Sequence, residues 1–286
     1  MRRQHGAMIR DPLVSVLIRS IGRETLARSV AAALAQTHRP LEIVIVNAGT
    51  KPLPPFPSAG DVRVLVVREP GATRPHAANV ALDHARGDWC IFLDDDDTFA
   101  PDHVRSLLDA AQRSGAAVAY SSTLCVDQYG RADMVVGAPF DRVHLVHGNY
   151  IQIGAALFAA SLVALGARFD ESLECLQDWD FWIQLAQLTH FEYTGKATNF
   201  WSAFMGASGA GMGSNGRAEV TAPFRERIAR KWAAYGVALR GKVNYHREAA
   251  RAAMSSGRVD SARRHLAAAA GLAAGPVAAE ARRRKA

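Results

Sequence analysis

Short apolar runs alternate with segments of helical periodicity over the first hundred residues. Four runs have the length and the apolar composition of buried strands: 13–18, 41–46, 62–67 and 89–93. Residues 24–36 and 77–86, which lie between them, are typical of helices. Strands that are apolar throughout and separated by helices predict a parallel sheet covered on both faces. Because ligands of such sheets bind at the carboxyl ends of the strands, we expect functional residues just after positions 18, 46 and 93.

Composition and charge narrow the class of protein. The chain has 286 residues, of which 49% are hydrophobic and 21% charged, which excludes a mainly disordered or fibrous chain. The net charge of +7 is uneven, because residues 1–216 hold 18 basic and 22 acidic side chains, whereas residues 217–286 hold 16 and 5. The positive excess therefore belongs to the C-terminal region and says nothing about the ligand of the main domain.

Cysteine usage and the N-terminus point to a cytoplasmic protein. The three cysteines, Cys90, Cys125 and Cys175, are too few and too far apart for a disulfide framework or a zinc ribbon. Residues 1–11 have no apolar segment behind their arginines and do not resemble a secretory signal. Residues 143–167 lack charged side chains, but their His, Asn, Gln and Gly residues favour a buried strand and helix over a membrane span.

Four consecutive carboxylates, Asp94 to Asp97, follow the strand at 89–93. Adjacent negative charges repel one another, and a divalent cation with a phosphorylated ligand is the usual compensation. The alternative is an acidic turn that caps a helix starting near Pro101. One Asp is enough for a cap, so the run favours a metal site.

An ordered set of segments resembles the family 2 glycosyltransferases. Its members are Val14–Ile18, Leu34–Thr37, Glu42–Val46, Asn79–Asp88, Phe92–Asp97 with Pro101, Gly166–Glu171 and Gln177–Trp182. The resemblance covers about residues 12–205. It implies the GT-A fold, an α/β fold with a Rossmann-like, mostly parallel sheet flanked by helices. It also implies a nucleotide-sugar donor, a divalent metal (Mn²⁺ or Mg²⁺) and inversion at the anomeric carbon.

The same resemblance assigns roles to the acidic run. Asp96 would bind the metal together with Asp94, while Asp94 and Asp95 would face the ribose or water in the metal shell. Asp97 is expected to cap the following helix. No histidine occurs between His190 and His246 to complete the ligand set, so we expect weak metal binding before the donor arrives.

The expected nucleotide pocket departs from the family pattern. Family members commonly carry Pro-Thr-Tyr-Asn after the first strand and Asp-Asp-Gly-Ser after the second, where this chain has Arg19-Ser20-Ile21-Gly22 and Asn47-Ala48-Gly49-Thr50. An amide can still hydrogen-bond a base edge, and an arginine can stack on a ring or pair with a phosphate. We therefore expect five residues to contact the donor: Arg19, Ser20, Asn47, Arg74 and Asn79. The alternative is a decayed pocket in which Arg19 is a solvated loop residue.

Asp178 is the candidate general base. It occupies the place of the family's catalytic carboxylate at the head of an acceptor-side helix, where Gln177 replaces the usual glutamate. Trp179 and Asp180 are weaker acceptor-side candidates, because an aromatic residue beside a helix is more often part of the core. Phe181 and Trp182 are expected to face the sheet.

The remaining chain divides by composition. After an N-terminal extension (1–11) and the main domain (12–205), residues 206–216 form a Gly-rich lid or linker, and residues 217–286 a basic, Ala-rich helical region. Within that region we expect a basic helix at 220–235 and a helical pair at 244–255 and 260–274. Its charge suits an anionic membrane surface or a protein partner. We also expect the main domain to keep its donor pocket without residues 217–286.

Three functions from different classes follow. The first is a metal-dependent, inverting glycosyltransferase that uses a glycan or a lipid-linked acceptor in cell-surface glycan synthesis. The second is an inactive nucleotide-sugar-binding module, suggested by Asn47 and Ala48. The third, nucleic-acid binding through the tail, is least favoured because few aromatic side chains accompany the basic ones.

Overall fold

The computed structural model describes residues 11–56, 60, 62–127, 129, 131–202 and 218–274, together with the backbone of two short strands, β1 (Arg3–Gln4) and β2 (Ala7–Met8). The Gly-rich segment 206–216 and residues 275–286 lie outside this description. Nine strands form the main sheet: β3 (Val14–Ser20), β4 (Leu41–Asn47), β5 (Arg63–Arg68), β6 (Trp89–Asp94), β7 (Thr98–Phe99), β8 (Val118–Val126), β9 (Ala132–Val136), β10 (Ala156–Ala159) and β11 (Phe191–Trp201). The described helices are α1 (Leu26–Leu34), α2 (Arg74–His84), α3 (His103–Ser114), α4 (Arg142–His147), α5 (Ala160–Ala164), α6 (Gln177–Leu188), α7 (Ala218–Ser255) and α8 (Val259–Ala274).

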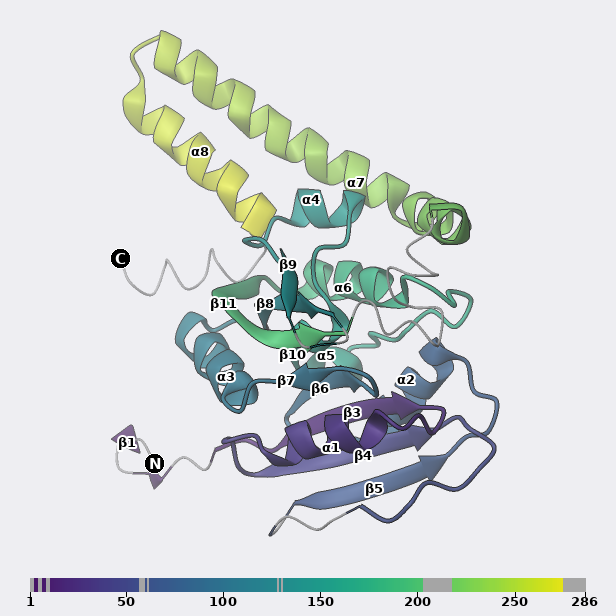
Figure 1. Cartoon of the computed structure of the whole chain (residues 1–286). Coiled ribbons are helices and arrows are strands. Elements are labelled where there is room, and N and C mark those ends of the chain that lie inside the picture. Colours follow the sequence, from purple (N-terminus) through teal and green to yellow (C-terminus); the bar gives the residue numbers. More distant parts are fainter. Residues whose placement is uncertain are drawn as a thin grey trace.

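The first half of the sheet is parallel, as predicted. Strands β5, β4, β3 and β6 lie side by side in that order (Figure 1), and each overlaps one of the predicted apolar runs. Neighbouring side chains of β3 enter two different cores: Val16 packs with α1 and α3, and Leu17 with α2. Both faces are therefore covered, which explains why β3 and β4 are buried at every position.

The second half of the sheet is mixed. Strand β10 runs antiparallel to both β6 and β8, whereas β11 runs parallel to β8 and antiparallel to β7. An aromatic core fills the space between this half and α6, with Phe169 stacked on Phe181 at 4.3 Å between ring centroids. Phe181 and Trp182 are fully buried there, which confirms that they belong to the core.

The C-terminal region is one long helix followed by a shorter one. The predicted helices at 220–235 and 244–255 are parts of one helix, α7. Gly236, which separates them in the sequence, lies where α7 crosses α4. A Cβ atom at Gly236 would lie 2.9 Å from Val146 Cγ1, so the missing side chain permits a close helix contact rather than a break. Beyond this contact α7 and α8 form a hairpin that projects from the domain (Figure 1). No described helix is long and apolar enough to cross a membrane.

The start of α7 is part of the main core, which corrects the expected division at residue 217. Ile228 is fully buried in the core that also contains α2 and α6, and Phe224 and Trp232 pack against it. A chain without residues 217–286 would lose these contacts. The main domain is therefore incomplete without the first half of α7.

Candidate active site

A cavity of about 300 Å³ opens where the predicted functional residues converge. Arg19 and Asp94, from the carboxyl ends of β3 and β6, line it together with Asp96 and Arg74. Asp178, from the first turn of α6, lines the same cavity. The structure thus brings the acidic run and the candidate base together across about eighty residues of sequence. A smaller hollow of about 80 Å³ adjoins it and shares Arg19, Arg74 and the acidic run.

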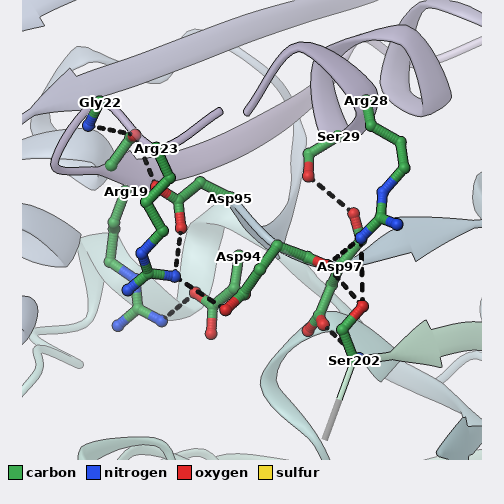
Figure 2. Close-up of polar contacts among 11 residues, drawn as sticks. Arg19, Gly22, Arg23, Arg28, Ser29, Asp94, Asp95, Asp97 and Ser202 are labelled. Atoms are coloured by element: carbon green, nitrogen blue, oxygen red, sulfur yellow. Dashed lines mark hydrogen bonds and ion pairs between the residues drawn. The ribbon is translucent and has the colours of Figure 1, made fainter. Parts of the chain in front are cut away.

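Arginines surround the acidic run (Figure 2). Arg19 forms an ion pair with Asp94, and the Arg23 guanidinium lies 2.8 Å from Asp95 and 2.7 Å from Asp96. Arg23 was not predicted, because nothing in its local sequence distinguishes it from a solvated loop residue. The mutual repulsion of the carboxylates is therefore offset in part by the protein itself.

Two of the predicted donor residues, Arg19 and Arg74, line the cavity. Arg19 is only 7% exposed, and its Nε and Nη1 atoms have no hydrogen-bond partner among the described residues. Its guanidinium also lies 5.6 Å from the centroid of the Phe92 ring. Burial lowers the pKa of Arg74, which nevertheless stays charged at neutral pH because an arginine pKa starts so high.

Opposing effects set the pKa values of Asp94 and Asp96. Burial alone raises the pKa of Asp94, but Arg19 and Arg74 outweigh it and hold the carboxyl below its usual range. Burial, reinforced by the charge of Asp94, raises the pKa of Asp96 to about 6. The ion pair with Arg23 lowers the pKa of Asp96 but does not outweigh these two effects.

The acidic run can provide part of a metal site. Asp94 Oδ2 and Asp96 Oδ1 form no hydrogen bond with described protein atoms, and both residues line the cavity. Carboxylate oxygens suit Mn²⁺ or Mg²⁺. Among the described residues, however, no three His, Cys, Asp or Glu side chains form a group that could hold a metal alone. The donor set fits a cation that takes its remaining ligands from a diphosphate and water.

Asp97 does not cap a helix, which corrects the prediction. Its carboxylate accepts the backbone N–H of Ser202 at 2.8 Å, and its carbonyl oxygen accepts from Ser29 Oγ at 2.7 Å (Figure 2). The chain turns into the short strand β7 before α3 begins, and Asp102 is the residue that precedes this helix. Asp97 therefore joins the acidic loop to the end of β11.

Asp178 has the environment of a base that works near neutral pH. Its Oδ2 accepts a hydrogen bond from Asn149 Nδ2 at 3.0 Å. Burial raises the pKa of Asp178 to about 6, against the lowering effect of the Trp179 backbone, Arg19 and Asn149. Leu176, just before α6, has φ of 59°, a left-handed conformation that is costly for leucine. Asn149 was not predicted, because it reaches Asp178 from a segment 29 residues away.

The two weaker acceptor-side candidates have different outcomes. Trp179 is 3% exposed and donates its indole N–H to Leu145 O at 2.6 Å, yet its ring still lines the cavity. Asp180 is wholly buried and accepts hydrogen bonds from Trp232 Nε1 at 2.8 Å and Lys231 Nζ at 3.0 Å. Asp180 therefore anchors α7 to α6, and its predicted role towards the acceptor is wrong.

Asn47 and Asn79 support loops and do not line this cavity, so their contact with the donor stays a prediction. The Asn47 amide donates to Lys51 O at 2.8 Å and accepts from Gly49 N at 3.0 Å, and the side chain is fully buried. Asn79 donates to Phe169 O at 3.0 Å and accepts from Phe169 N at 2.9 Å, so it holds the segment before α6. Ser20 donates to Asp95 at 2.6 Å and lines only the smaller hollow.

The C-terminal region also contributes to the cavity. Thr221 and Arg225, both from the start of α7, line it. Trp201 and Ser202, at the end of β11, line it as well. The residues that flank the segment 203–217 on either side thus both border the cavity. The lid or linker predicted at 206–216 itself lies outside the described residues. Sequence alone gave no reason to place α7 at the site.

Comparisons with known proteins agree with this geometry. The family model described as Glycosyl transferase family 2 matches residues 15–145. Succinoglycan biosynthesis protein ExoO of Rhizobium meliloti (strain 1021) is 33% identical over 116 residues, which are 38% of this chain and 32% of that protein. The uncharacterized glycosyltransferase RP339 of Rickettsia prowazekii (strain Madrid E) is 26% identical over 200 residues, which are 63% of this chain and 61% of that protein. The chain thus spans between about a third and three fifths of these two relatives.

Solved structures share the fold. Residues 1–349 of S. aureus TarS, in complex with UDP-GlcNAc, match with a TM-score of 0.54 and 15% sequence identity, over 65% of this chain and 57% of that one. The same protein in complex with UDP matches with a TM-score of 0.52 and 17% identity, over 65% of this chain and 59% of that one. The described sheet and its flanking helices therefore have the expected α/β architecture.

Proposed function

We propose that the chain is a family 2 glycosyltransferase with the GT-A fold, which transfers a sugar from a nucleotide-sugar donor to an acceptor hydroxyl in the synthesis of a cell-surface glycan. The observation that carries the proposal is the single cavity lined by Asp94, Asp96 and Asp178. A transferase of this kind needs charge stabilisation at the leaving diphosphate and a base at the acceptor. The cavity offers residues for both tasks.

Arg19 and Arg74 are proposed to bind the donor diphosphate. Both line the two adjoining hollows, and the free Nε and Nη1 donors of Arg19 suit phosphate oxygens. The guanidinium keeps its charge in a buried site, which a lysine would lose more readily. Because Asn47 is occupied within its own loop, we do not assign it a contact with the nucleobase.

Asp96 and Asp94 are proposed to hold a divalent cation together with the diphosphate. When bound, the cation supplies charge neutralisation to the departing diphosphate. The two carboxylates provide too few ligands for tight binding without the nucleotide. We therefore propose that metal and donor bind together.

Asp178 is proposed to act as the general base of an inverting transfer. It accepts the proton of the acceptor hydroxyl while that oxygen bonds to the anomeric carbon. The bond from this carbon to the diphosphate breaks at the same time, and its electron pair leaves with the nucleoside diphosphate. A pKa of about 6 leaves Asp178 mostly ionised at neutral pH, yet more basic than an exposed carboxylate.

The variant Asp178→Asn tests the base. It keeps the shape of the side chain but removes its basicity, so we expect the rate of sugar transfer to fall by roughly 10²–10⁴-fold with donor affinity little changed. Glu174→Gln, an exposed charge removed from the same loop, serves as the control and keeps the parent rate. A near-parental rate for Asp178→Asn would place the base elsewhere.

Thermal shifts with nucleotides test donor and metal binding together. We expect one of UDP, GDP, dTDP or CMP to raise the melting temperature, and Mn²⁺ to increase that rise. Asp96→Asn should remove the increase due to Mn²⁺ and keep the fold. The same response in variant and parent contradicts the metal assignment. Nucleotide binding without turnover of any donor favours the inactive binding module.

The projecting hairpin is the proposed contact with an anionic membrane surface. Residues 236–274 carry seven basic and two acidic side chains. Several apolar side chains of the hairpin are also exposed, among them Val237, Tyr245 and Leu266. Basic and apolar side chains together favour the interface of an anionic membrane.

A further inference from the structure

A cation on α7 lines the same cavity as the candidate base. Arg225 lines the cavity that contains Asp178, and its guanidinium lies 6.0 Å from the centroid of the Trp179 ring. Its Nε donates to Thr221 Oγ1 at 3.4 Å, a long and weak bond. The side chain is exposed, and its two terminal nitrogens form no hydrogen bond with a described residue, so they are available to a ligand.

Two neighbouring cations of α7, Lys231 and Arg227, are engaged by the protein, whereas Arg225 is not paired with any described carboxylate. Lys231 forms ion pairs with Asp170 at 2.7 Å and Asp180 at 3.0 Å. Arg227 donates to Ser172 O at 2.6 Å. The undescribed residues 203–217, which precede α7, contain no Asp or Glu in their sequence. The positive charge at this wall of the cavity therefore lacks an anion from the adjoining chain.

The position of Arg225 assigns it to the acceptor and not to the donor. Arg19 and Arg74 line both hollows beside the acidic run, whereas Arg225 lines only the larger one. Its partner Trp179 follows Asp178 directly in α6. Arg225 thus belongs to the side of the cavity that holds the base.

We propose that Arg225 binds an anionic group, a carboxylate or a phosphate, carried by the acceptor close to the hydroxyl that attacks. This inference rests on the proposed function and names the substrate class of the same site. The planar guanidinium can donate two parallel hydrogen bonds to either oxyanion. An acceptor held in this way would present its hydroxyl to Asp178, while a neutral acceptor would leave the cation without a counter-charge.

Binding of small probes to the 286-residue chain, saturated with the nucleotide that the thermal shift identifies, tests the inference. Two matched pairs, followed by NMR titration, separate the two sources of the anion: methyl β-D-glucuronide against methyl β-D-glucoside, and glycerol 1-phosphate against glycerol. We expect at least one anionic compound to bind about tenfold more tightly than its neutral partner, as one charge-assisted hydrogen bond allows. Arg225→Gln should abolish that preference, whereas Arg227→Gln, on the same helix, should keep it.

The outcomes separate this inference from the function on which it rests. A parent protein that binds its nucleotide but prefers neither anionic compound overturns the role of Arg225 and leaves the proposed function intact. A preference that survives in Arg225→Gln overturns it equally. If the thermal shift finds no nucleotide that binds, the proposed function itself fails. The pair that shows the preference identifies the anion as carboxylate or phosphate.

Discussion

Asn149 is the side chain that orients the candidate base. Its amide N–H favours the charged form of Asp178, because it donates to the carboxylate and not to the neutral acid. The bond also fixes the direction in which Asp178 faces the cavity. Asn149 thus acts through another residue and is a positioning residue.

The variant Asn149→Ala should move the pH dependence of the reaction. Loss of the hydrogen bond raises the pKa of Asp178 above about 6. On acidification, Asp178 is therefore protonated, and lost as a base, at a higher pH than in the parent. We expect the acid limb of the pH–rate profile to shift upwards and the activity at pH 6 to fall more than that at pH 8. Gln152→Ala, which removes a cavity-lining amide that is not bonded to Asp178, should leave this limb in place. An unmoved limb in both variants would exclude the positioning role.

The sequence predicted site residues that lie in an unusual local pattern. It did not predict the roles of residues that depend on hydrogen bonds to distant segments. Asp94 and Asp96 were found because four adjacent carboxylates need an explanation, and Asp178 because its segment resembles a family motif. For Asn79, the sequence does not reveal that both ends of its side-chain amide are hydrogen-bonded to the backbone of Phe169. The bonds of Arg23 and Asn149 join distant segments and have no local signal.

The contact between α6 and α7 depends on one buried carboxylate. Asp180 is fully buried and accepts hydrogen bonds from Gln184, Lys231 and Trp232. These bonds satisfy its charge and fix the start of α7 against the domain. Because α7 also supplies Arg225, the same contact positions one wall of the cavity.

Asp180→Ala should destabilise the protein by about 3 kcal/mol, because it leaves a cation and an indole N–H without their buried acceptor. The midpoint of urea unfolding measures this loss. Asp170→Ala removes the other partner of Lys231, which is a more exposed carboxylate, and should cost no more than about 1 kcal/mol. Equal losses for the two variants would contradict the anchoring role of Asp180.

At the level of elements, the parallel half of the sheet was predictable and the mixed half was not. Strands β3, β4 and β6 are buried on both faces and therefore appear as continuous apolar runs. Strand β11 contains exposed and half-buried positions with register shifts against β8, and β7 has only two residues. Their pairing depends on distant segments, so the pattern of apolar positions carries little information about it.

The described part of the chain joins an α/β domain to a helical hairpin without a clean boundary. The core extends to Ile228 and Trp232, and the cavity extends to Arg225. The hairpin beyond Gly236 packs mainly on itself through Leu239, Val243 and Ala269. The part of α7 near the domain therefore contributes to the core and to the cavity, whereas the hairpin can contact another surface.

Two truncations should separate these parts. A chain that ends at residue 216 loses the buried face of α7, and we expect it to be insoluble or to show no nucleotide-dependent thermal shift. A chain that ends at Ser255 keeps that face and should keep the shift. It also loses seven basic and two acidic side chains, so its binding to anionic lipid vesicles in sedimentation should fall strongly. Full vesicle binding by this shorter chain would contradict the membrane contact, and capture of a protein partner instead would reassign it.

The unbroken course of α7 sets a distance within the molecule. From Arg225 in the cavity to Ser255 at the turn of the hairpin, thirty residues rise along one helix, which corresponds to about 45 Å. Helices of this length behave as stiff rods. A surface that binds the far end is therefore held at a fixed height above the cavity. If the hairpin makes the proposed membrane contact, α7 therefore sets the height above the membrane at which the cavity can reach an acceptor hydroxyl.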